Sequence, residues 1–369
     1  MHQFIHACAG SGKTETIVKR CADVDNQKSR IAITLTLSGQ DELEQRLRSS
    51  CRLSNVPKVT GWYEFLLTHI IKPYLPLKFP DQLITGFYFP REKQNNGYIR
   101  VCKADPKRYF LPDGRVHKDY VEELAFEIIN EAKGKVEFRL GRIFDEIIID
   151  EVQDISREGL SVLEKLLYSR EFDLFIVGDS RQSLIDSSLR SKKNKTADRL
   201  GLVKWYEKFE NQGLLKIEHL AYTYRFNQAI AAFSDLIFEP TCGFAPTESR
   251  FKTCSGHDGI FLVDRKDMES YLETFSPVNL RYNKKSWANL EKVEFQNFGV
   301  VKGRTFDRVA IFATKPIQDF IGKGQYLKDK SACGFYVAVT RARYSVAIIM
   351  KSVPTTLDSN LGVKIWKPN

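Results

Sequence analysis

Short apolar runs recur along the chain and alternate with segments of helical periodicity. Runs of strand length, rich in Ile, Val, Phe and Leu, cover residues 4–7, 30–35, 144–149, 172–177, 214–219, 260–263, 309–312 and 345–350. Several are apolar at nearly every position, which is typical of strands buried on both faces of a parallel sheet. Segments with helical spacing of apolar residues lie between them, at residues 15–21, 41–49, 120–132, 158–168 and 227–238. This alternation predicts an α/β fold with mainly parallel sheets flanked by helices.

One stretch interrupts the alternation. Residues 73–116 contain six prolines and many Lys and Arg side chains. We interpret this stretch as the centre of a loop-rich basic subdomain, about residues 66–139, inserted into the first of two domains. A chain of 369 residues is long enough for two domains, which we place at residues 1–222 and 223–369.

Composition indicates the kind of partner, the state of the cysteines and the cellular location to expect. The formal net charge of +10 favours a polyanionic partner such as nucleic acid. The seven cysteines are scattered without a Cys-x-x-Cys pair, which indicates reduced thiols rather than disulfides or a zinc site. No apolar run reaches the ~20 residues of a membrane span, and the first residues do not resemble a secretory signal. We therefore expect a cytoplasmic protein that has no membrane partner.

A glycine-rich segment, Ala9-Gly10-Ser11-Gly12-Lys13-Thr14, follows the first apolar run and precedes a helical segment. Such a turn presents backbone N–H groups and a helix N-terminus to an anion. We expect Lys13 to reach the β- and γ-phosphates of ATP and Thr14 to hold Mg²⁺. A Cβ atom at Gly10 or Gly12 would crowd the phosphates. Residues 9–14 are therefore predicted to bind ATP, and an ordinary strand–helix loop is the alternative.

Two further polar segments follow apolar runs. Asp150 and Glu151 come directly after the run at 144–149, and α/β sheets bind ligands at the carboxyl ends of their strands. We expect Asp150 to bind Mg²⁺ and Glu151 to polarise the attacking water; the alternative is the acidic first turn of a helix. Gln182, after the next apolar run, could hydrogen-bond the γ-phosphate, although in isolation a polar turn is the simpler interpretation.

The order of these segments resembles the UvrD/Rep/PcrA family of superfamily 1 helicases. The matching segments are residues 7–14 (ACAGSGKT), 150–154 (DEVQD), 178–183 (GDSRQS), 223–225 (TYR), 299–307 (GVVKGRTFD) and 336–342 (YVAVTRA), with a looser match at 60–65 (TGWYEF). The resemblance implies two RecA-like domains with a nucleotide cleft between them. It also implies that Arg225 and Arg341 are arginine fingers and that Gly303 and Thr305 contact the nucleotide. For each arginine, a surface ion pair is the alternative.

The chain departs from the family's pattern around the base and the ribose. Thr305 stands where the family has a ribose-binding glutamate, and a hydroxyl bonds a ribose less strongly than a carboxylate does. Only three residues precede the first apolar run, so the family's upstream adenine-contacting glutamine has no clear counterpart other than Gln3. Selectivity for the nucleotide base therefore stays open.

The aromatic residues on which bases stack in the family are also replaced, at residues 34–37, 185 and 187. Trp62, Tyr63 or Phe65 could supply one such platform, worth about 1–3 kcal/mol per base, although aromatics at that spacing are more often core residues. The segments at 190–195 and 281–287 carry cations that could hold phosphates; solvated loops are the alternative. The interval between Arg225 and Lys302 is too short for the family's large accessory subdomain.

The resemblance implies an ATP-driven translocase or helicase that acts on single-stranded DNA with 3′→5′ polarity. A second hypothesis is an ATPase switch or regulatory subunit of a larger complex, with a protein partner and little unwinding activity. The missing stacking residues and the compact length favour this second hypothesis, and the complete set of ATP motifs favours the first. By family analogy alone, such a component could belong to an anti-phage system.

The two chemical roles at the ATP site can be separated by substitution. Lys13→Ala removes the cation expected at the phosphates and is predicted to abolish hydrolysis. Glu151→Gln keeps the size of the side chain but removes its basicity, so it is predicted to bind ATP without turnover. Nucleotide binding and phosphate release, measured side by side, test both. A hydrolysing Glu151→Gln protein would show that the water is activated elsewhere.

Overall fold

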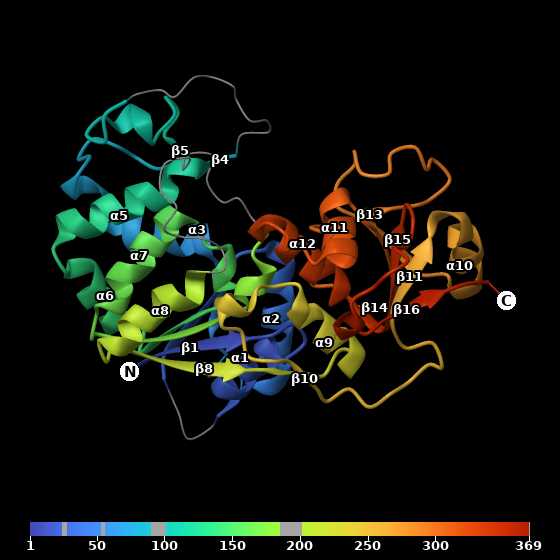
Figure 1. Cartoon of the computed structure of the whole chain (residues 1–369). Helices are drawn as coiled ribbons and strands as arrows, with labels where there is room; N and C mark the ends of the chain where they lie inside the picture. The colour runs from blue at the N-terminus through green and yellow to red at the C-terminus, as the bar shows by residue number, and fades with distance from the viewer. Residues whose placement is uncertain (24–27, 53–55, 90–100, 185–200, 369) are drawn as a thin grey trace.

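The chain forms two parallel six-stranded sheets flanked by helices (Figure 1). The structure, a computed structural model, describes residues 1–23, 28–52, 56–89, 101–184 and 201–368. The first sheet has the order β3-β2-β6-β7-β1-β8. Its strands are β1 (His2–Ala7), β2 (Arg30–Thr34), β3 (Lys58–Gly61), β6 (Glu146–Ile149), β7 (Asp173–Gly178) and β8 (Leu215–Leu220). The predicted α/β class with mainly parallel sheets is confirmed.

Helices follow the strands of the first sheet and cover its faces (Figure 1). They are α1 (Lys13–Ala22), α2 (Leu37–Ser50), α3 (Trp62–Phe65), α4 (Lys72–Tyr74), α5 (Val121–Ala132), α6 (Lys135–Ile143), α7 (Arg157–Leu167) and α8 (Leu202–Asn211), with a π-helical segment at Leu66–Ile71. The central strands β2 and β6 are buried at every position, which explains why their sequences are almost continuously apolar.

Strand order places the three predicted ATP segments side by side. Strands β6, β7 and β1 are neighbours in the sheet, and all of them run parallel. The glycine-rich loop follows β1, the acidic pair follows β6, and the segment with Gln182 follows β7. Because parallel strands end at the same edge, three segments that are far apart in sequence meet at one carboxyl edge.

The second sheet has the order β13-β12-β14-β15-β11-β16 and is also parallel. Its strands are β11 (Gly259–Asp264), β12 (Val278–Arg281), β13 (Gln296–Asn297), β14 (Phe306–Phe312), β15 (Ala342–Met350) and β16 (Val363–Trp366). The helices around it are α9 (Gln228–Leu236), α10 (Met268–Phe275), α11 (Lys315–Lys323) and α12 (Asp329–Val339). Short strand pairs, β4 (Gly86–Tyr88) with β5 (Arg115–His117) and β9 (Tyr222–Thr223) with β10 (Glu248–Ser249), complete the pairing.

All eight apolar runs form strands, as predicted. The prediction omitted β3, β12 and β16, which are four residues long and only partly buried. Partial exposure allows polar residues on such strands, so their sequences lack the continuous apolar run that marks a central strand. The boundary at residue 222 stays a prediction, as does the inserted subdomain, whose basic residues at 90–100 lie outside the described part of the chain.

Two other sequence expectations concern cysteines and membranes. All seven cysteines lie among the described residues, and there none of them takes part in a disulfide. In the described part of the chain, no helix is both long enough and apolar enough to cross a membrane.

A buried carboxyl group joins the helices that cover one face of the first sheet. Glu122 on α5 accepts hydrogen bonds from Trp62 Nε1, at 2.7 Å, and from Ser156 Oγ. Ser156 is the N-cap of α7 and also accepts from the Gly159 N–H at 3.0 Å. Burial raises the pKa of Glu122 to about 7, although the bonds from Ser156 and Trp62 oppose that rise.

The raised pKa of Glu122 predicts a pH-dependent stability. The folded protein retains the Glu122 proton from the ordinary value of 4.5 up to about 7, whereas the unfolded chain releases it. Stability should therefore fall as pH rises through this window, by at most about 3 kcal/mol. Glu122→Gln should remove that slope in urea unfolding between about pH 5 and pH 8. Glu171→Gln, at an exposed site, serves as the control, and an unchanged slope in Glu122→Gln would contradict the assignment.

Candidate functional site

The loop of residues 9–14, the phosphate loop, connects β1 to α1. Gly10 and Gly12 have φ angles of 74° and 87°, in the left-handed region that favours glycine. Ser11 is 3% exposed, and its Oγ has no hydrogen-bond partner among the described residues. A buried polar atom without a partner costs about 1–3 kcal/mol. This hydroxyl and the N-terminus of α1 therefore suit a bound anion, so the residues present fit a nucleotide phosphate.

Gly10 is where the phosphate loop touches the segment that follows the first sheet. The Tyr224 N–H donates to Gly10 O at 3.0 Å. A Cβ atom at Gly10 would lie 2.5 Å from Thr223 Oγ1 and 2.6 Å from Arg225 Cβ. The absence of a side chain at Gly10 thus allows residues 223–225 to pack against the loop. This packing restricts residue 10 to glycine in addition to the crowding of phosphates that was expected from the sequence. At Gly12 the described residues show no such contact, and the left-handed backbone is the constraint.

Asp150 and Glu151 lie at the carboxyl end of β6. Glu151 has a φ angle of 54°, which is uncommon for a residue with a side chain. Burial, together with the neighbouring Glu151, raises the pKa of Asp150 despite the opposing charge of Lys13. Burial also disfavours the ionised form of Glu151, but Lys302 and Lys13 outweigh it and lower its pKa. The charges of Lys302 and Lys13 therefore favour the ionised form of Glu151.

Lys302 neutralises this charge from the other sheet. It lies in the loop before β14, and its Nζ is 3.0 Å from Glu151 Oε2 and also contacts Asp154 Oδ2. Burial disfavours the ammonium ion, but Glu151 and Asp154 more than compensate and raise the pKa of Lys302. Lys302 lies within the segment 299–307 that resembles the helicase family, but that resemblance gave it no role. Its position directly before Gly303 was the available signal.

Gln153 links the acidic pair to the end of β7. Its Nε2 donates to Glu151 Oε2, and its Oε1 accepts from the Asp179 N–H at 3.0 Å. Ser183 Oγ donates to Gln153 O at 3.0 Å. A Cβ atom at Gly178 would lie 2.7 Å from Gln153 Oε1, so a glycine is needed for this approach. The two segments after β6 and β7 therefore act as one hydrogen-bonded unit.

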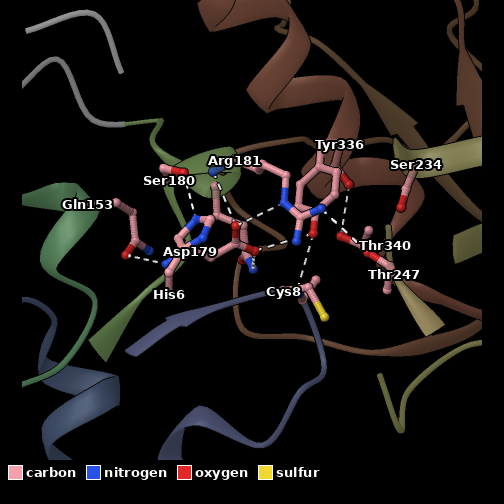
Figure 2. Close-up of polar contacts among 12 residues, drawn as sticks. His6, Cys8, Gln153, Asp179, Ser180, Arg181, Ser234, Thr247, Tyr336 and Thr340 are labelled. Atoms are coloured by element: carbon pink, nitrogen blue, oxygen red, sulfur yellow. Dashed lines mark hydrogen bonds and ion pairs between the residues drawn. The ribbon is translucent and has the colours of Figure 1, made fainter. Parts of the chain in front are cut away.

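Asp179 is fully buried and has partners from both halves of the chain (Figure 2). Its Oδ2 accepts from Gln182 Nε2 at 2.8 Å and from Tyr336 OH at 3.3 Å, and its Oδ1 accepts from Arg181 Nε at 3.3 Å. Arg181 also pairs with Asp235 Oδ1 at 3.0 Å, and its guanidinium lies 4.9 Å from the centre of the Tyr336 ring. Burial disfavours the carboxylate, but Arg181 and Lys13 outweigh it and lower the pKa of Asp179.

Tyr336 connects this network to the phosphate loop. It lies on α12, and its hydroxyl accepts from the Ala9 N–H at 3.1 Å while it donates to Asp179. On the opposite side of the network, His6 Nε2 is 2.9 Å from Ser180 Oγ (Figure 2). Burial lowers the pKa of His6 to about 3, so the ring is neutral. The network thus contains the charges of Asp179, Arg181 and Asp235 without a further cation from His6.

The two predicted arginine fingers lie on the side of the second sheet that faces the phosphate loop. Arg341 is 1% exposed and donates from NH2 to Gln182 Oε1 at 3.3 Å and from NH1 to Arg304 O at 3.2 Å. Arg225 donates from NH1 to Thr340 O at 3.4 Å. Burial and the neighbouring Arg225 lower the pKa of Arg341 to about 9. Within the described residues, neither Arg225 nor Arg341 forms the surface ion pair considered as the alternative. Two adjacent guanidinium groups of this kind are suited to a polyanionic ligand.

Comparison with known proteins identifies the family. The sequence profile of the AAA domain family matches residues 2–187, which include the phosphate loop, the acidic pair and Gln182. The chain belongs to the AAA domain family. This match agrees with the resemblance to the UvrD/Rep/PcrA helicases that the motifs predict.

Individual relatives of this AAA-family chain are distant. Gabija protein GajB from Bacillus cereus (strain VD045) is 26% identical over 64% of the chain and 47% of its own length. An ATP-dependent helicase/nuclease subunit from Enterococcus faecalis (strain ATCC 700802 / V583) is 27% identical over 51% of the chain and 14% of its own length. The chain therefore spans less than half of either curated relative. A crystal structure of arterivirus nonstructural protein 10 (helicase) aligns with 95% of the chain and 59% of its own length, at 15% identity and a TM-score of 0.46.

Other predicted residues lie outside this hydrogen-bonded network. Gly303 and Thr305 lie in the connection to β14, and no hydrogen bond among the described residues joins either of them to residues 9–14. Trp62 and Phe65 are 1% and 0% exposed, so the suggestion that they stack on bases is wrong; they fill the core. Tyr63 is partly buried beside Lys118. Residues 185, 187 and 190–195 lie outside the described part of the chain.

The Tyr336 hydroxyl can be tested as a structural link. Tyr336→Phe removes the acceptor of the Ala9 N–H and one donor to buried Asp179, which should cost about 1–3 kcal/mol. Urea unfolding measures this loss. Tyr326→Phe, at a 47% exposed site, should change stability by less than about 0.5 kcal/mol. Equal stability of Tyr336→Phe and the wild type would show that the hydroxyl is not a necessary link.

Proposed function

We propose that this protein is an ATP-dependent translocase or helicase that moves on single-stranded DNA with 3′→5′ polarity. The observation that carries the proposal is that residues of the second sheet contact all three loops at one edge of the first sheet. Arg341 contacts Gln182, Lys302 contacts Glu151, and Tyr336 contacts Ala9. A cleft built from both halves can change shape when its ligand changes, which is what a motor requires.

Each residue of the cleft has a role in binding or hydrolysis of ATP in this proposal. The phosphate-loop residues Ala9, Gly10, Ser11, Gly12 and Lys13 would hold the phosphates, and Gln182 would bond the γ-phosphate. Thr14 and Asp150 would hold a magnesium ion, whose charge would neutralise the phosphate oxygens when it is bound. The buried arginines Arg225 and Arg341 would neutralise the charge that develops on the transferred phosphoryl group. An arginine finger contributes about 10³–10⁵ in rate in well-studied NTPases.

Glu151 would accept the proton of the attacking water at a carboxylate oxygen. Water oxygen bonds to the γ-phosphorus, the bond to the bridging oxygen breaks, and ADP and phosphate result. With Lys302 3.0 Å away, the lowered pKa of Glu151 makes it a poor base. We infer that Lys302 must move away from Glu151 before turnover, so the position of the second sheet controls the reactivity of a residue on the first. This coupling would transmit a change at the nucleotide to the strand.

We assign nucleic acid as the polyanionic partner that the net charge of +10 attracts. The polarity and the preference for DNA come from the resemblance to UvrD, Rep and PcrA. Gly303 and Thr305 would approach the ribose when the cleft closes. Tyr224 is 54% exposed, and its backbone is bonded to Gly10, so its ring is a candidate surface for the nucleotide base.

A second candidate function is an ATPase switch or regulatory subunit that works with a protein partner. Two observations favour it. The relative from Enterococcus faecalis is named as a subunit of a helicase/nuclease, and Trp62 and Phe65 are unavailable for base stacking. In that case the same closure of the cleft would be transmitted to a partner protein instead of a strand.

Nucleic-acid dependence of ATP turnover distinguishes the two functions. We expect single-stranded DNA to stimulate turnover at least about tenfold over no nucleic acid or duplex, as in motors whose cleft closes on the strand. Lys13→Ala is the control for contaminating ATPase. Displacement of a labelled strand should require a 3′ tail and fail with a 5′ tail. Turnover that is indifferent to DNA and RNA would reject the translocase and favour the switch.

A further inference from the structure

A cavity of about 350 Å³ lies at the carboxyl edge of the second sheet. Strands β14, β15 and β11 are neighbours, and the residues just after them, Thr314 with Lys315, Lys351, and Arg265, line this cavity. The loop after β12 contributes Trp287. We call this cavity the edge pocket. Carboxyl ends of parallel strands are where α/β domains bind ligands, and the proposed ATP cleft occupies the other end of this sheet.

Trp287 is held in place at the wall of the edge pocket. Its Nε1 donates to Ala313 O at 3.0 Å, and its ring packs edge-on against Phe312 with centroids 5.5 Å apart. Its φ angle of 54° is strained for a bulky residue. The side chain is nevertheless only partly buried. A fixed indole that remains accessible is suited to stack on a planar ring.

The rest of the pocket is positively charged. Arg265, Lys315 and Lys351 are exposed, and the Arg265 guanidinium is 5.8 Å from the centre of the Trp287 ring. Lys315 also pairs with Asp319 of its own helix at 3.2 Å. Among the described residues that line the pocket, none is Asp or Glu. Helix α11 begins there without a side-chain cap, so its first N–H groups add to the attraction for an anion.

We propose that the edge pocket binds one nucleotide of a single nucleic-acid strand. The phosphate is held by Arg265, Lys351 and the N-terminus of α11, and the base stacks on Trp287. The proposal rests on the proposed function, because it names where the strand contacts the second sheet. It also supplies a base platform in a chain whose Trp62 and Phe65 are core residues.

The surroundings favour a strand over a free nucleotide. Lys284 and Lys285 are exposed in the same loop as Trp287, and exposed Lys266 follows Arg265. A strand can place successive phosphates against these cations, whereas a mononucleotide can use only one cluster. The seven residues of β14 separate this pocket from the ATP cleft by roughly 20 Å. Substitutions in the pocket should therefore leave ATP turnover without nucleic acid unchanged.

Binding of an oligothymidine to the whole protein without ATP tests the proposal. The variant R265Q/K351Q removes both cations from the one phosphate held in the pocket, so the slope of log K against log salt should fall by about 0.7. The matched variant R142Q/K216Q removes two exposed charges near the amino edge of the first sheet and should keep the wild-type slope. W287F retains an aromatic ring for folding. It should lose most of the quenching of tryptophan fluorescence that the oligonucleotide causes, and bind several-fold more weakly.

The possible outcomes separate this proposal from the proposed function. Unchanged slope and quenching in the variants would overturn the pocket while leaving the translocase intact. Quenching of Trp287 by dTMP, without binding of the oligonucleotide, would also overturn it, because the pocket would then take a free nucleotide. The expected slopes in a protein without strand-stimulated ATP turnover would uphold the pocket and reject the motor.

Discussion

The structure depends on the partners that compensate the negative charge of one fully buried carboxylate, Asp179. Burial of an unpaired charge costs several kcal/mol, and it is tolerated only where partners replace the lost water. Arg181 and Gln182 come from its own segment, and Tyr336 comes from α12. Tyr336 also accepts from Ala9 in the phosphate loop. The requirement to satisfy Asp179 therefore fixes the second half of the chain against the loop that is proposed to bind ATP.

The carboxylate of Glu151 differs from that of Asp179. Its partner, Lys302, occupies space that a bound nucleotide would share. Lys302 reaches Glu151 and Asp154 from the other sheet, and a bound nucleotide would bring its own charges into the same space. Asp179 and its partners form a buried junction, whereas the contact of Lys302 with Glu151 is the one that we propose must open before turnover. The two arginines, Arg225 and Arg341, lie close enough together for one to lower the pKa of the other. Their mutual repulsion favours a state in which an anion lies between them.

The two sheets meet edge to edge, so that the proposed ATP cleft and the edge pocket lie at opposite ends of the second sheet. Residues after β1, β6 and β7 face those before β14 and β15, so the carboxyl edge of one sheet meets the amino edge of the next. The carboxyl edge of the second sheet lies at the opposite end, where the cations and Trp287 of the edge pocket lie. A fixed spacing between the two sites would allow events at the nucleotide to act on a strand through rigid strands such as β14 and β15.

The sequence by itself determined the parallel α/β fold, because strands buried on both faces must be apolar along their whole length. It also predicted the phosphate loop from its two glycines, whose left-handed backbone favours that residue, although at Gly10 the packing of Thr223 and Arg225 adds a tertiary reason. Only the tertiary structure decided which residues complete the site. Lys302, Tyr336 and Asp179 lie in segments that resemble the helicase motifs, but the resemblance gave them no role; their roles arise from contacts between residues more than 140 positions apart. The aromatic residues show the same limit. Trp62 and Trp287 look alike in sequence, and burial on α3 makes one a core residue while an edge loop leaves the other accessible.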